Sequence, residues 1–441
     1  MGTPVHGPDL RAARPGQSRR ALLAGSVGNF IEWYEFGVYG YFATVIAARF
    51  FTPEGGSEVE GLVKTYASFA LAFFFRPVGA ALFGRLADRI GRRPVLILVI
   101  VLMTGATTLI GALPTYATVG ALAPWLLTLL RVVQGLSAGG EFGGAVSVMT
   151  EFAPPGRRGL YGSWQSFTVA LGLLGGAGVA ALLAGVLSTG QLGDWGWRLP
   201  FLLTLPLGLG ALWLRLRLDE TPAFEAEVVC EAAGSPPARE VARAVALGAG
   251  RVMGWAAAGY TFLVVLPSYL QSTLNASFQQ ALLATVFANL GFAVTIIPAG
   301  LLSDRIGRRA VMLPGALLVV VLAVPLLNLL QDTGVSAGAK GVAVFGAGAV
   351  VGLMAGPGPA MLAELFPTSV RCTGLGLAYA LSNAVFSGCA GLIITETVKR
   401  TGNVDIPAYY AVATCALSAL ALSVAPARHG AGGKGELTEC S

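Results

Sequence analysis

Several charged residues lie inside stretches of this sequence that are otherwise apolar. The set contains three glutamates and three arginines: Glu32, Glu35, Glu141, Arg76, Arg131 and Arg251. Near the middle of a bilayer an unpaired charge would cost about 3 kcal/mol, so charges kept there pair, meet water or bind ions. A carboxyl in a low dielectric beside a like charge can take up and release a proton, whereas an arginine stays charged and grips carboxylates. The expected chemistry is proton transfer and anion binding, with purely structural ion pairs as the alternative.

The apolar segment at 124–151 places its polar residues at helical spacing. Arg131, Gln134, Ala138 and Glu141 would fall within about 80° of arc at 100° per residue. A continuous helix would therefore carry them as one stripe.

The segment at 21–50 has a comparable stripe. Asn29, Glu32, Phe36 and Tyr39 recur at helical spacing, and Glu35 lies one turn from Glu32, so the two carboxyls share a face. The predicted proton-coupling residues are Glu32, Glu35 and Glu141. The predicted substrate-binding residues are Arg76, Arg131, Asn29, Tyr39 and Gln134.

Two loops carry the same hexapeptide, Asp-Arg-Ile-Gly-Arg-Arg, at 88–93 and 304–309, about half the chain apart. A second spacing is also duplicated, with an acid at 151 and 364 and an arginine at 158 and 371. Such acids and arginines can form ion pairs that lock two halves together on one side of a membrane. The predicted cytoplasmic gate residues are Asp88, Arg92, Glu151, Arg158, Asp304, Arg308, Glu364 and Arg371. Alternatively, the arginines serve only to anchor the topology.

The composition excludes most soluble classes of protein. Hydrophobic residues make up 55% of the 441, and charged residues only 12%, about half the share in soluble domains. The five cysteines are scattered and the two histidines, His6 and His429, lie near the ends, so we expect no disulfide framework and no metal site. We expect no cofactor and no enzymatic activity. The net charge is +6, but the positive residues alternate between loops, as a membrane topology requires. This distribution does not favour nucleic acid as a partner.

The apolar runs predict the topology. About twelve of them are long enough, at roughly 20 residues each, to cross a bilayer. Most of the 29 basic residues fall in alternate loops, which predicts that both termini are cytoplasmic. The expected fold is an all-α membrane protein of twelve transmembrane helices in two pseudo-symmetric six-helix bundles. The predicted segments are a tail at 1–20, a bundle at 21–218, a linker at 219–243, a bundle at 244–425 and a tail at 426–441.

Some motifs are misleading. The glycine-rich run at 346–352 imitates a dinucleotide loop but has the wrong spacing and lies in an apolar span. The sequence has no Gly-Lys-Ser/Thr phosphate loop, so this chain is not expected to use ATP directly.

Taken together, the motifs resemble the major facilitator superfamily and, more narrowly, its metabolite:proton symporter family. The loop hexapeptide marks the superfamily, whereas the narrower resemblance rests on a combination that includes GNFIEWYEFGVY at 28–39 and RVVQGLSAGGEFGG at 131–144. The remaining matching motifs lie at 76–79, 156–161, 195–200, 220–222 and 364–367. One departure is Glu35, where members commonly have aspartate.

This resemblance implies uptake of a small organic acid or zwitterion, driven by protons, at the cell membrane. Known substrates of the family include 2-oxoglutarate, citrate, shikimate, proline and betaine. Trp33, Tyr34, Trp164 and Trp255 could form a cation–π site for a betaine-like group, so the substrate stays open. The alternatives are a proton-coupled antiporter, disfavoured because the glycine-rich run at 162–185 has no proline, and a nutrient sensor that does not transport. We expect the protein to work in the bilayer as a monomer.

Overall fold

The computed structural model describes residues 15–53, 56–90, 92–151, 153–154, 156–216, 237–366 and 371–424. Within these ranges the chain is helical and contains no strand. The first half consists of α1 (Pro15–Tyr41), α2 (Ala43–Ile46), η1 (Ala47–Phe51), α3 (Glu58–Ile90), α4 (Arg92–Ala112), α5 (Tyr116–Val119), α6 (Leu122–Ala138), α7 (Phe142–Glu151), α8 (Arg158–Val186), α9 (Thr189–Gln191), η2 (Leu192–Gly196), α10 (Arg198–Leu202) and α11 (Thr204–Leu216).

The second half of the chain repeats this plan. It consists of α13 (Ala238–Gly259), η3 (Tyr260–Val265), α14 (Leu266–Ser272), α15 (Phe278–Ile306), α16 (Arg308–Gln331), α17 (Ala337–Ala355), α18 (Gly358–Ala363), α19 (Arg371–Ser382), η5 (Asn383–Gly388), α20 (Ala390–Thr401) and α21 (Ile406–Ser423). The η segments are wide helical turns, of which η3 joins α13 to α14 and η5 leads from α19 to α20 within one passage.

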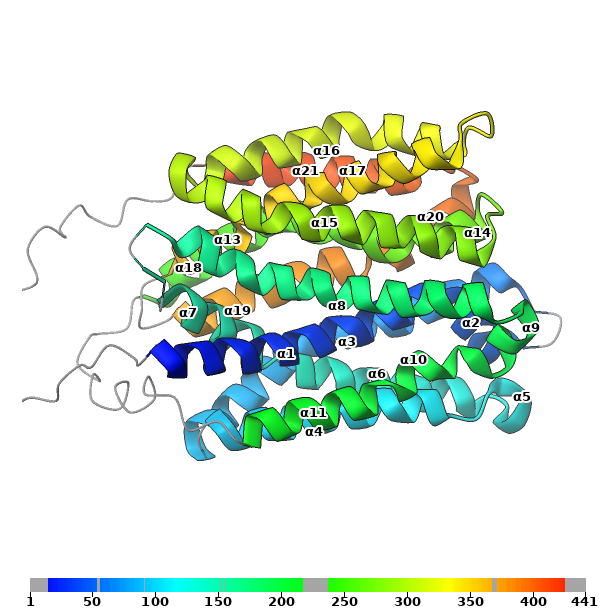
Figure 1. Ribbon diagram of the computed structural model, residues 1–441, viewed down its shortest axis with the longest axis horizontal. Helices are drawn as coiled ribbons and strands as arrows, with labels where there is room; N and C mark the ends of the chain where they lie inside the picture. Colours follow the sequence, from blue (N-terminus) through cyan, green and yellow to red (C-terminus); the bar gives the residue numbers. More distant parts are fainter. Residues whose placement is uncertain are drawn as a thin grey trace, which may run out of the picture.

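The helices run side by side in two groups (Figure 1), the first half of the chain forming one group and the second half the other. The groups meet where α8 packs along α15 and where α3 packs against α19, η5 and α20. The model thus confirms the predicted all-α architecture, and the site must be sought where these groups meet.

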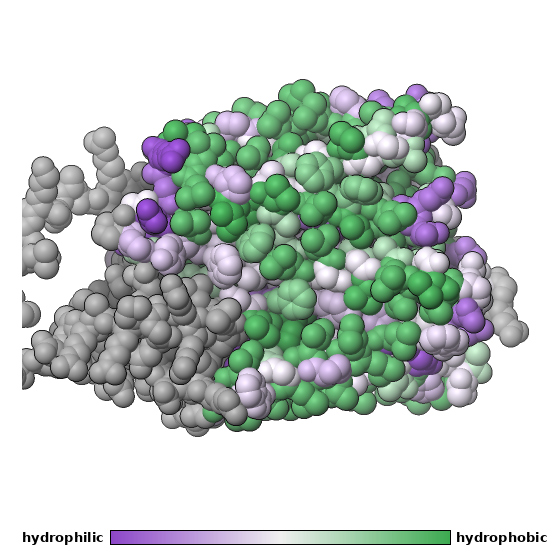
Figure 2. Space-filling model, viewed as in Figure 1, coloured by the Kyte–Doolittle hydropathy of each residue, from purple (hydrophilic) through white to green (hydrophobic). Residues whose placement is uncertain are grey.

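The outer surface is that of a membrane protein. Nine helical segments of the described chain are long and apolar enough to cross a bilayer, and two shorter apolar helices, Ile97–Ala112 and Leu122–Ala138, lie beside them. Figure 2 shows an apolar band around the middle of the visible face and hydrophilic residues at both ends of the helices. Large apolar side chains on this surface, such as Trp125 and Val342, are each 74% exposed. Contact with lipid tails explains this exposure, and the multi-pass prediction is confirmed.

Glycines bring α3 and α6 into direct backbone contact. A Cβ atom at Gly135 or Gly139 of the α6 passage would overlap the backbone of Ala72 or Arg76, and one at Gly79 would overlap Leu136. Small residues allow this approach in lipid, where close packing holds helices together. The contact sets Arg76 and Arg131, one from each helix, beside the same core.

Two sequence expectations need correction. The stripe from Arg131 to Glu141 is not one continuous helix, because α6 ends at Ala138 and a turn at 139–141 precedes α7. Consecutive glycines at this point are poor helix formers. In addition, α13 begins at Ala238, inside the predicted linker, because its charged first turns extend the helix beyond the apolar stretch.

Candidate functional site

Two arginines lie buried in the core of the first group, against aromatic rings. Arg76 of α3 is 3% exposed and Arg131 of α6 is fully buried. The guanidinium carbon of Arg76 lies 4.4 Å from the ring centroid of Phe36 and 4.2 Å from that of Phe73. That of Arg131 lies 4.9 Å from Phe36 and 4.1 Å from Tyr39. The two predicted anion-binding residues therefore contact the same aromatic cluster, and both lie beside the ring of Phe36.

Arg131 is connected to Glu35 by a chain of buried hydrogen bonds. Its Nη1 donates to Gln134 Oε1 at 2.6 Å, and Gln134 Nε2 donates to Thr107 Oγ1 at 2.5 Å. Thr107 Oγ1 in turn donates to Glu35 Oε2 at 2.6 Å. The other carboxylate oxygen of Glu35 is buried with no hydrogen-bond partner among the described residues. This series of hydrogen bonds joins α6, α4 and α1, and it leaves one oxygen of Glu35 as an unused acceptor.

The other two predicted proton-coupling residues each pair with an arginine. Glu32 Oε1 lies 3.1 Å from Arg76 Nη2, an ion pair without hydrogen-bond geometry, with side chains 8% and 4% exposed. Glu141, in the turn after α6, pairs with Arg215 of α11. Arg215 is not recognisable from the sequence, because a basic residue at the end of a span is typical of the flank of any transmembrane helix.

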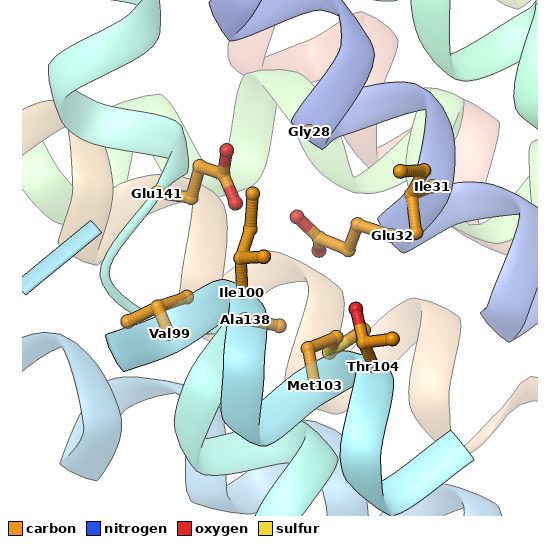
Figure 3. A pocket seen from close by; sticks show the side chains of 9 residues that line it. All are labelled: Gly28, Ile31, Glu32, Val99, Ile100, Met103, Thr104, Ala138 and Glu141. Carbon is orange, nitrogen blue, oxygen red and sulfur yellow. The ribbon is translucent and has the colours of Figure 1, made fainter. Parts of the chain in front are cut away.

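A small pocket of about 10 Å³ separates these two ion pairs. Figure 3 shows Glu32 and Glu141 extending toward one another across it, with Gly28 at its rim. A Cβ atom at Gly28 would overlap both Glu141 and Arg215, so this pair lies directly on α1, one turn from Glu32. The pocket has the size of a single water molecule. The three predicted carboxyls thus gather around the same stretch of α1, with Glu32 and Glu35 on the helix itself and Glu141 facing Glu32 from the turn after α6.

Two further predicted residues have structural contacts in this model. Asn29 Nδ2 donates to Thr168 Oγ1 at 2.6 Å and to the carbonyl of Gln165 at 3.1 Å, which joins α1 to α8. Tyr39 shares a hydrogen bond of 2.6 Å with Ser68 Oγ while its ring lies under Arg131. Both lie close to the charged cluster, so a binding role for them stays a prediction.

Arg251, the third arginine in a span, lies outside this cluster. Its Nη2 donates to the carbonyl of Val424 at 2.7 Å and its Nε to that of Ala421 at 3.3 Å. It therefore caps the end of α21. For this residue the contacts favour a structural role over proton transfer or anion binding.

A second cavity, of about 30 Å³, lies between the two groups of helices. We call it the central cavity. Its lining residues are Trp33, Val169, Leu173, Val252, Trp255, Ala256, Gly259, Tyr260, Leu263, Val264, Phe292, Tyr379, Asn383 and Ser387. None of them is charged. About 15 Å³ holds one water molecule, so the cavity is too small for a metabolite and the molecule is in a closed state.

The cavity is closed at the end of the bundle where α1 begins. Asp304, at the end of α15, accepts hydrogen bonds from the backbone N–H groups of Gly159 at 2.7 Å and Leu160 at 2.9 Å. Arg308 donates to Asp304 at 2.6 Å and to Glu364 at 3.0 Å. A carboxylate at a helix N-terminus is stabilised by the unpaired N–H groups and by the helix dipole. Asp304 thus bonds the second group of helices to α8 of the first.

The structure brings only some of the predicted gate residues into this network. Asp304, Arg308 and Glu364 form it, whereas the side chain of Arg158 is exposed and the backbone that follows it provides the donors. The side chains of Asp88, Arg92, Glu151 and Arg371 lie outside the described residues.

Different contacts close the opposite end. Tyr66 of α3 shares a hydrogen bond of 2.6 Å with Ser268 of α14, and Thr44 donates to Gln271 at 3.1 Å. Further out, Lys399 Nζ lies 3.3 Å from Glu60. These pairs do not follow from the sequence, because a single hydroxyl group or an isolated exposed charge gives no pattern. Both ends of the molecule are therefore closed by contacts between the two groups.

Comparison with known proteins gives consistent results for both halves of the chain. Residues 21–233 match the family model described as "Sugar (and other) transporter", and residues 247–436 match that of the Major Facilitator Superfamily. The chain is 35% identical to the proline/betaine transporter of Escherichia coli (strain K12), over 91% of this chain and 82% of the relative.

Two other relatives act on organic acids, by their names. The alpha-ketoglutarate permease of Escherichia coli (strain K12) is 36% identical, over 93% of this chain and 94% of the relative. The citrate-proton symporter of Klebsiella pneumoniae is 34% identical, over 94% and 96%. Among solved structures, a D-xylose-proton symporter matches with a TM-score of 0.72 and 20% identity over 91% of this chain and 97% of that one, which supports the fold.

Proposed function

We propose that this chain, which belongs to the metabolite:proton symporters of the major facilitator superfamily, imports a small carboxylate-bearing metabolite together with protons. Import would proceed by alternating access. It is a membrane transporter and not an enzyme. The observation that carries the proposal is that Arg76 contacts both a residue of the cavity wall and a buried carboxylate. Trp33 lines the central cavity, and the guanidinium carbon of Arg76 lies 5.6 Å from its ring, while Arg76 is the ion-pair partner of Glu32. Arg76 thus connects the wall of the substrate space, at Trp33, with Glu32, the carboxyl that binds the proton.

This arrangement supports a coupling mechanism. When Glu32 is ionised, it neutralises Arg76, and the cavity has no net attraction for an anion. When Glu32 is protonated, the positive charge of Arg76 becomes available to a carboxylate in the cavity. Proton binding and substrate binding therefore favour one another, and that mutual dependence is the condition for symport. Glu35, one turn along α1, and Glu141, in the turn after α6, are further carboxyls that bind the proton, and coupling requires Glu35 as well as Glu32.

The driving force is adequate for uptake. A membrane potential of 100 mV supplies about 2.3 kcal/mol for each charge moved, which corresponds to roughly 50-fold accumulation. Alternation then requires that the contacts at the two ends break in turn. At one end these are the bonds of Asp304 to α8, and at the other the Tyr66–Ser268 pair.

The orientation proposed for the chain follows the distribution of basic residues. Both termini are cytoplasmic, so the Asp304 network is the cytoplasmic gate. Because the cavity lies between the two halves of one chain, the monomer contains a whole transport site.

The lining of the central cavity favours one kind of substrate. The lining includes the aromatic rings of Trp33, Trp255, Tyr260 and Tyr379, and none of the described residues that line the space is charged. Aromatic rings attract cations, whereas a polycarboxylate would need several positive partners. We therefore favour a zwitterion with one carboxylate and one cationic group over a di- or tricarboxylate.

Uptake into liposomes tests this function. Purified protein is reconstituted, a proton gradient is imposed from outside to inside, and labelled glycine betaine, proline, 2-oxoglutarate and citrate are supplied in turn. We expect accumulation of a zwitterion that an uncoupler abolishes. If nothing accumulates and a preloaded organic compound leaves as protons enter, the protein is an antiporter. Saturable binding without any flux would identify a sensor.

A further inference from the structure

Tyr260 has a buried hydroxyl group for which the described residues supply no hydrogen-bond partner. Its side chain lines the central cavity and the residue is 5% exposed. Two polar neighbours in the same lining are engaged, since Ser387 Oγ donates to Asn383 Oδ1 at 2.9 Å and Asn383 Nδ2 to the carbonyl of Tyr379 at 3.0 Å. Buried polar groups in native proteins are almost always paired. An unpaired hydroxyl in a cavity wall points to a partner that enters the cavity.

The backbone around Tyr260 is shaped to present this group. Tyr260 opens η3, where the helix of α13 widens into a π-type turn, a feature found frequently at functional sites. Asn289 of α15 holds this turn from outside, because its Nδ2 donates to the carbonyl of Leu263 at 3.3 Å and to Tyr41 Oη at 3.3 Å. The position of Tyr260 is therefore set by the fold before any ligand binds.

The ring of Tyr260 also contacts the charged cluster of the first half. It lies 5.4 Å from the ring of Phe73 and 5.9 Å from that of Phe69. The guanidinium carbon of Arg76 lies 4.2 Å from the ring centroid of Phe73, and that of Arg131 lies 4.9 Å from the ring centroid of Phe69. A ligand at the Tyr260 hydroxyl is thus close to the field of two buried positive charges.

We propose that the Tyr260 hydroxyl is a substrate ligand that donates its hydrogen bond to the carboxylate of the transported molecule. The assignment rests on the proposed function and adds to it a specificity-determining residue from the second half of the chain. A phenol donor and a carboxylate acceptor form a charge-assisted hydrogen bond. Together with Arg76 behind Trp33, Tyr260 would orient the carboxylate toward the first half and leave the rest of the molecule against Trp255 and Tyr379.

The substitution Tyr260→Phe tests this assignment by removing only the hydroxyl. Since that group has no hydrogen-bond partner among the described residues, the variant is expected to fold with a melting temperature equal to or above that of the wild type. Binding is measured in detergent, without any gradient, by the fluorescence of the cavity tryptophans. The probes are glycine betaine, proline and 2-oxoglutarate, with choline, prolinol and dimethyl 2-oxoglutarate as counterparts that lack a free carboxylate.

We expect Tyr260→Phe to weaken the tightest-binding carboxylate by about 10- to 100-fold, as for a hydrogen bond to a charged group, and to change its counterpart by less than twofold. The matched control is Tyr269→Phe, in the same passage, whose hydroxyl donates to the carbonyl of Val404 at 2.8 Å. It should lower the melting temperature and leave binding unchanged.

Three results would overturn the assignment: unchanged binding in Tyr260→Phe, equal weakening of both members of a pair, or a wild type that binds none of the carboxylates. The proposed function is tested separately, by uptake. A wild type that binds a carboxylate selectively through Tyr260 but never accumulates it would retain this site and refute the symporter.

Discussion

Arg131 and Glu35 are linked through two intermediate side chains, Gln134 and Thr107, over three consecutive hydrogen bonds of 2.5–2.6 Å. Gln134 and Thr107 pass the polarisation of the guanidinium to one oxygen of the carboxylate. The other oxygen is left without a partner among the described residues. Glu35 is therefore held in place on one side while its second oxygen remains open to a proton.

Interrupting this series of hydrogen bonds at Thr107 should uncouple substrate transport from proton movement. Thr107→Val keeps the shape but removes the donor to Glu35 and the acceptor for Gln134. We expect proton-driven accumulation to fall about tenfold or more, since a buried hydrogen bond to a charged group is worth about 1.5–3 kcal/mol. Accumulation is measured in liposomes at a fixed pH gradient.

A neighbouring threonine provides the control for that substitution. Thr108 shares a longer hydrogen bond of 3.3 Å with Thr204 and takes no part in the hydrogen bonds that link Arg131 to Glu35. Thr108→Val should therefore transport like the wild type. An equal loss in both variants would mean that the effect is one of packing.

The bond between Asp304 and α8 should control access from one side. Asp304→Asn keeps the size but removes the charge that faces Arg308 and the two N–H groups of α8. A charge at a helix terminus contributes about 0.3–2 kcal/mol, so the open state at this end should gain up to about 30-fold in population. Labelling of a cysteine introduced at the central cavity, with a reagent supplied from that side, measures the change.

An exposed aspartate serves for comparison. Asp332 accepts a hydrogen bond from the N–H of Gly334, within its own loop. Asp332→Asn should leave labelling unchanged. Labelling of Asp304→Asn at the wild-type rate would contradict a gating role for this carboxylate.

The glycine contact between α3 and α6 should be essential to stability. In Gly135→Ala the new methyl group would overlap the backbone of Ala72, which cannot move without displacing α3. We expect a loss of about 2–4 kcal/mol in the free energy of unfolding, typical of overpacking or worse. Thermal unfolding in detergent reports the loss as a lower melting temperature.

A lipid-facing glycine makes the matched comparison. A Cβ atom at Gly210 of α11 would meet no heavy atom within 4 Å. Gly210→Ala should be neutral or stabilising by up to about 1 kcal/mol, because alanine is the better helix former. If Gly135→Ala were equally well tolerated, the close approach of the two helices would not be required.

Much of this arrangement could be predicted from the sequence, because hydrophobicity and helical spacing are local properties. Apolar length predicted the spans, and the i to i+3 spacing of Arg131 and Gln134 predicted that they share a face, which their hydrogen bond confirms. The duplicated loops drew attention to Asp304 and Arg308, which share a hydrogen bond of 2.6 Å, whereas their role as a gate stays a prediction.

The remaining parts of the site depend on which helices pack together, and a single sequence does not contain that information. Thr107 and Arg215 became recognisable only once α4 and α11 were placed beside α1. The backbone N–H groups that bind Asp304 have no side-chain signature at all. The break after Ala138 does not follow from helical spacing, because glycines are frequent inside transmembrane helices as well as at helix ends.

The central claim is that buried carboxyls in the first half bind the proton that drives uptake, and Glu35→Gln tests it most directly. The amide keeps a similar shape but cannot exchange a proton. The matched control is Glu396→Gln, which removes a surface ion pair with Arg400. Two assays are run on the same liposomes: accumulation under an inward proton gradient, and exchange of labelled for unlabelled substrate without a gradient. The account predicts that Glu35→Gln abolishes accumulation, retains exchange and no longer responds to external pH, while the control behaves like the wild type. Accumulation by Glu35→Gln that still rises as the external pH falls would contradict it.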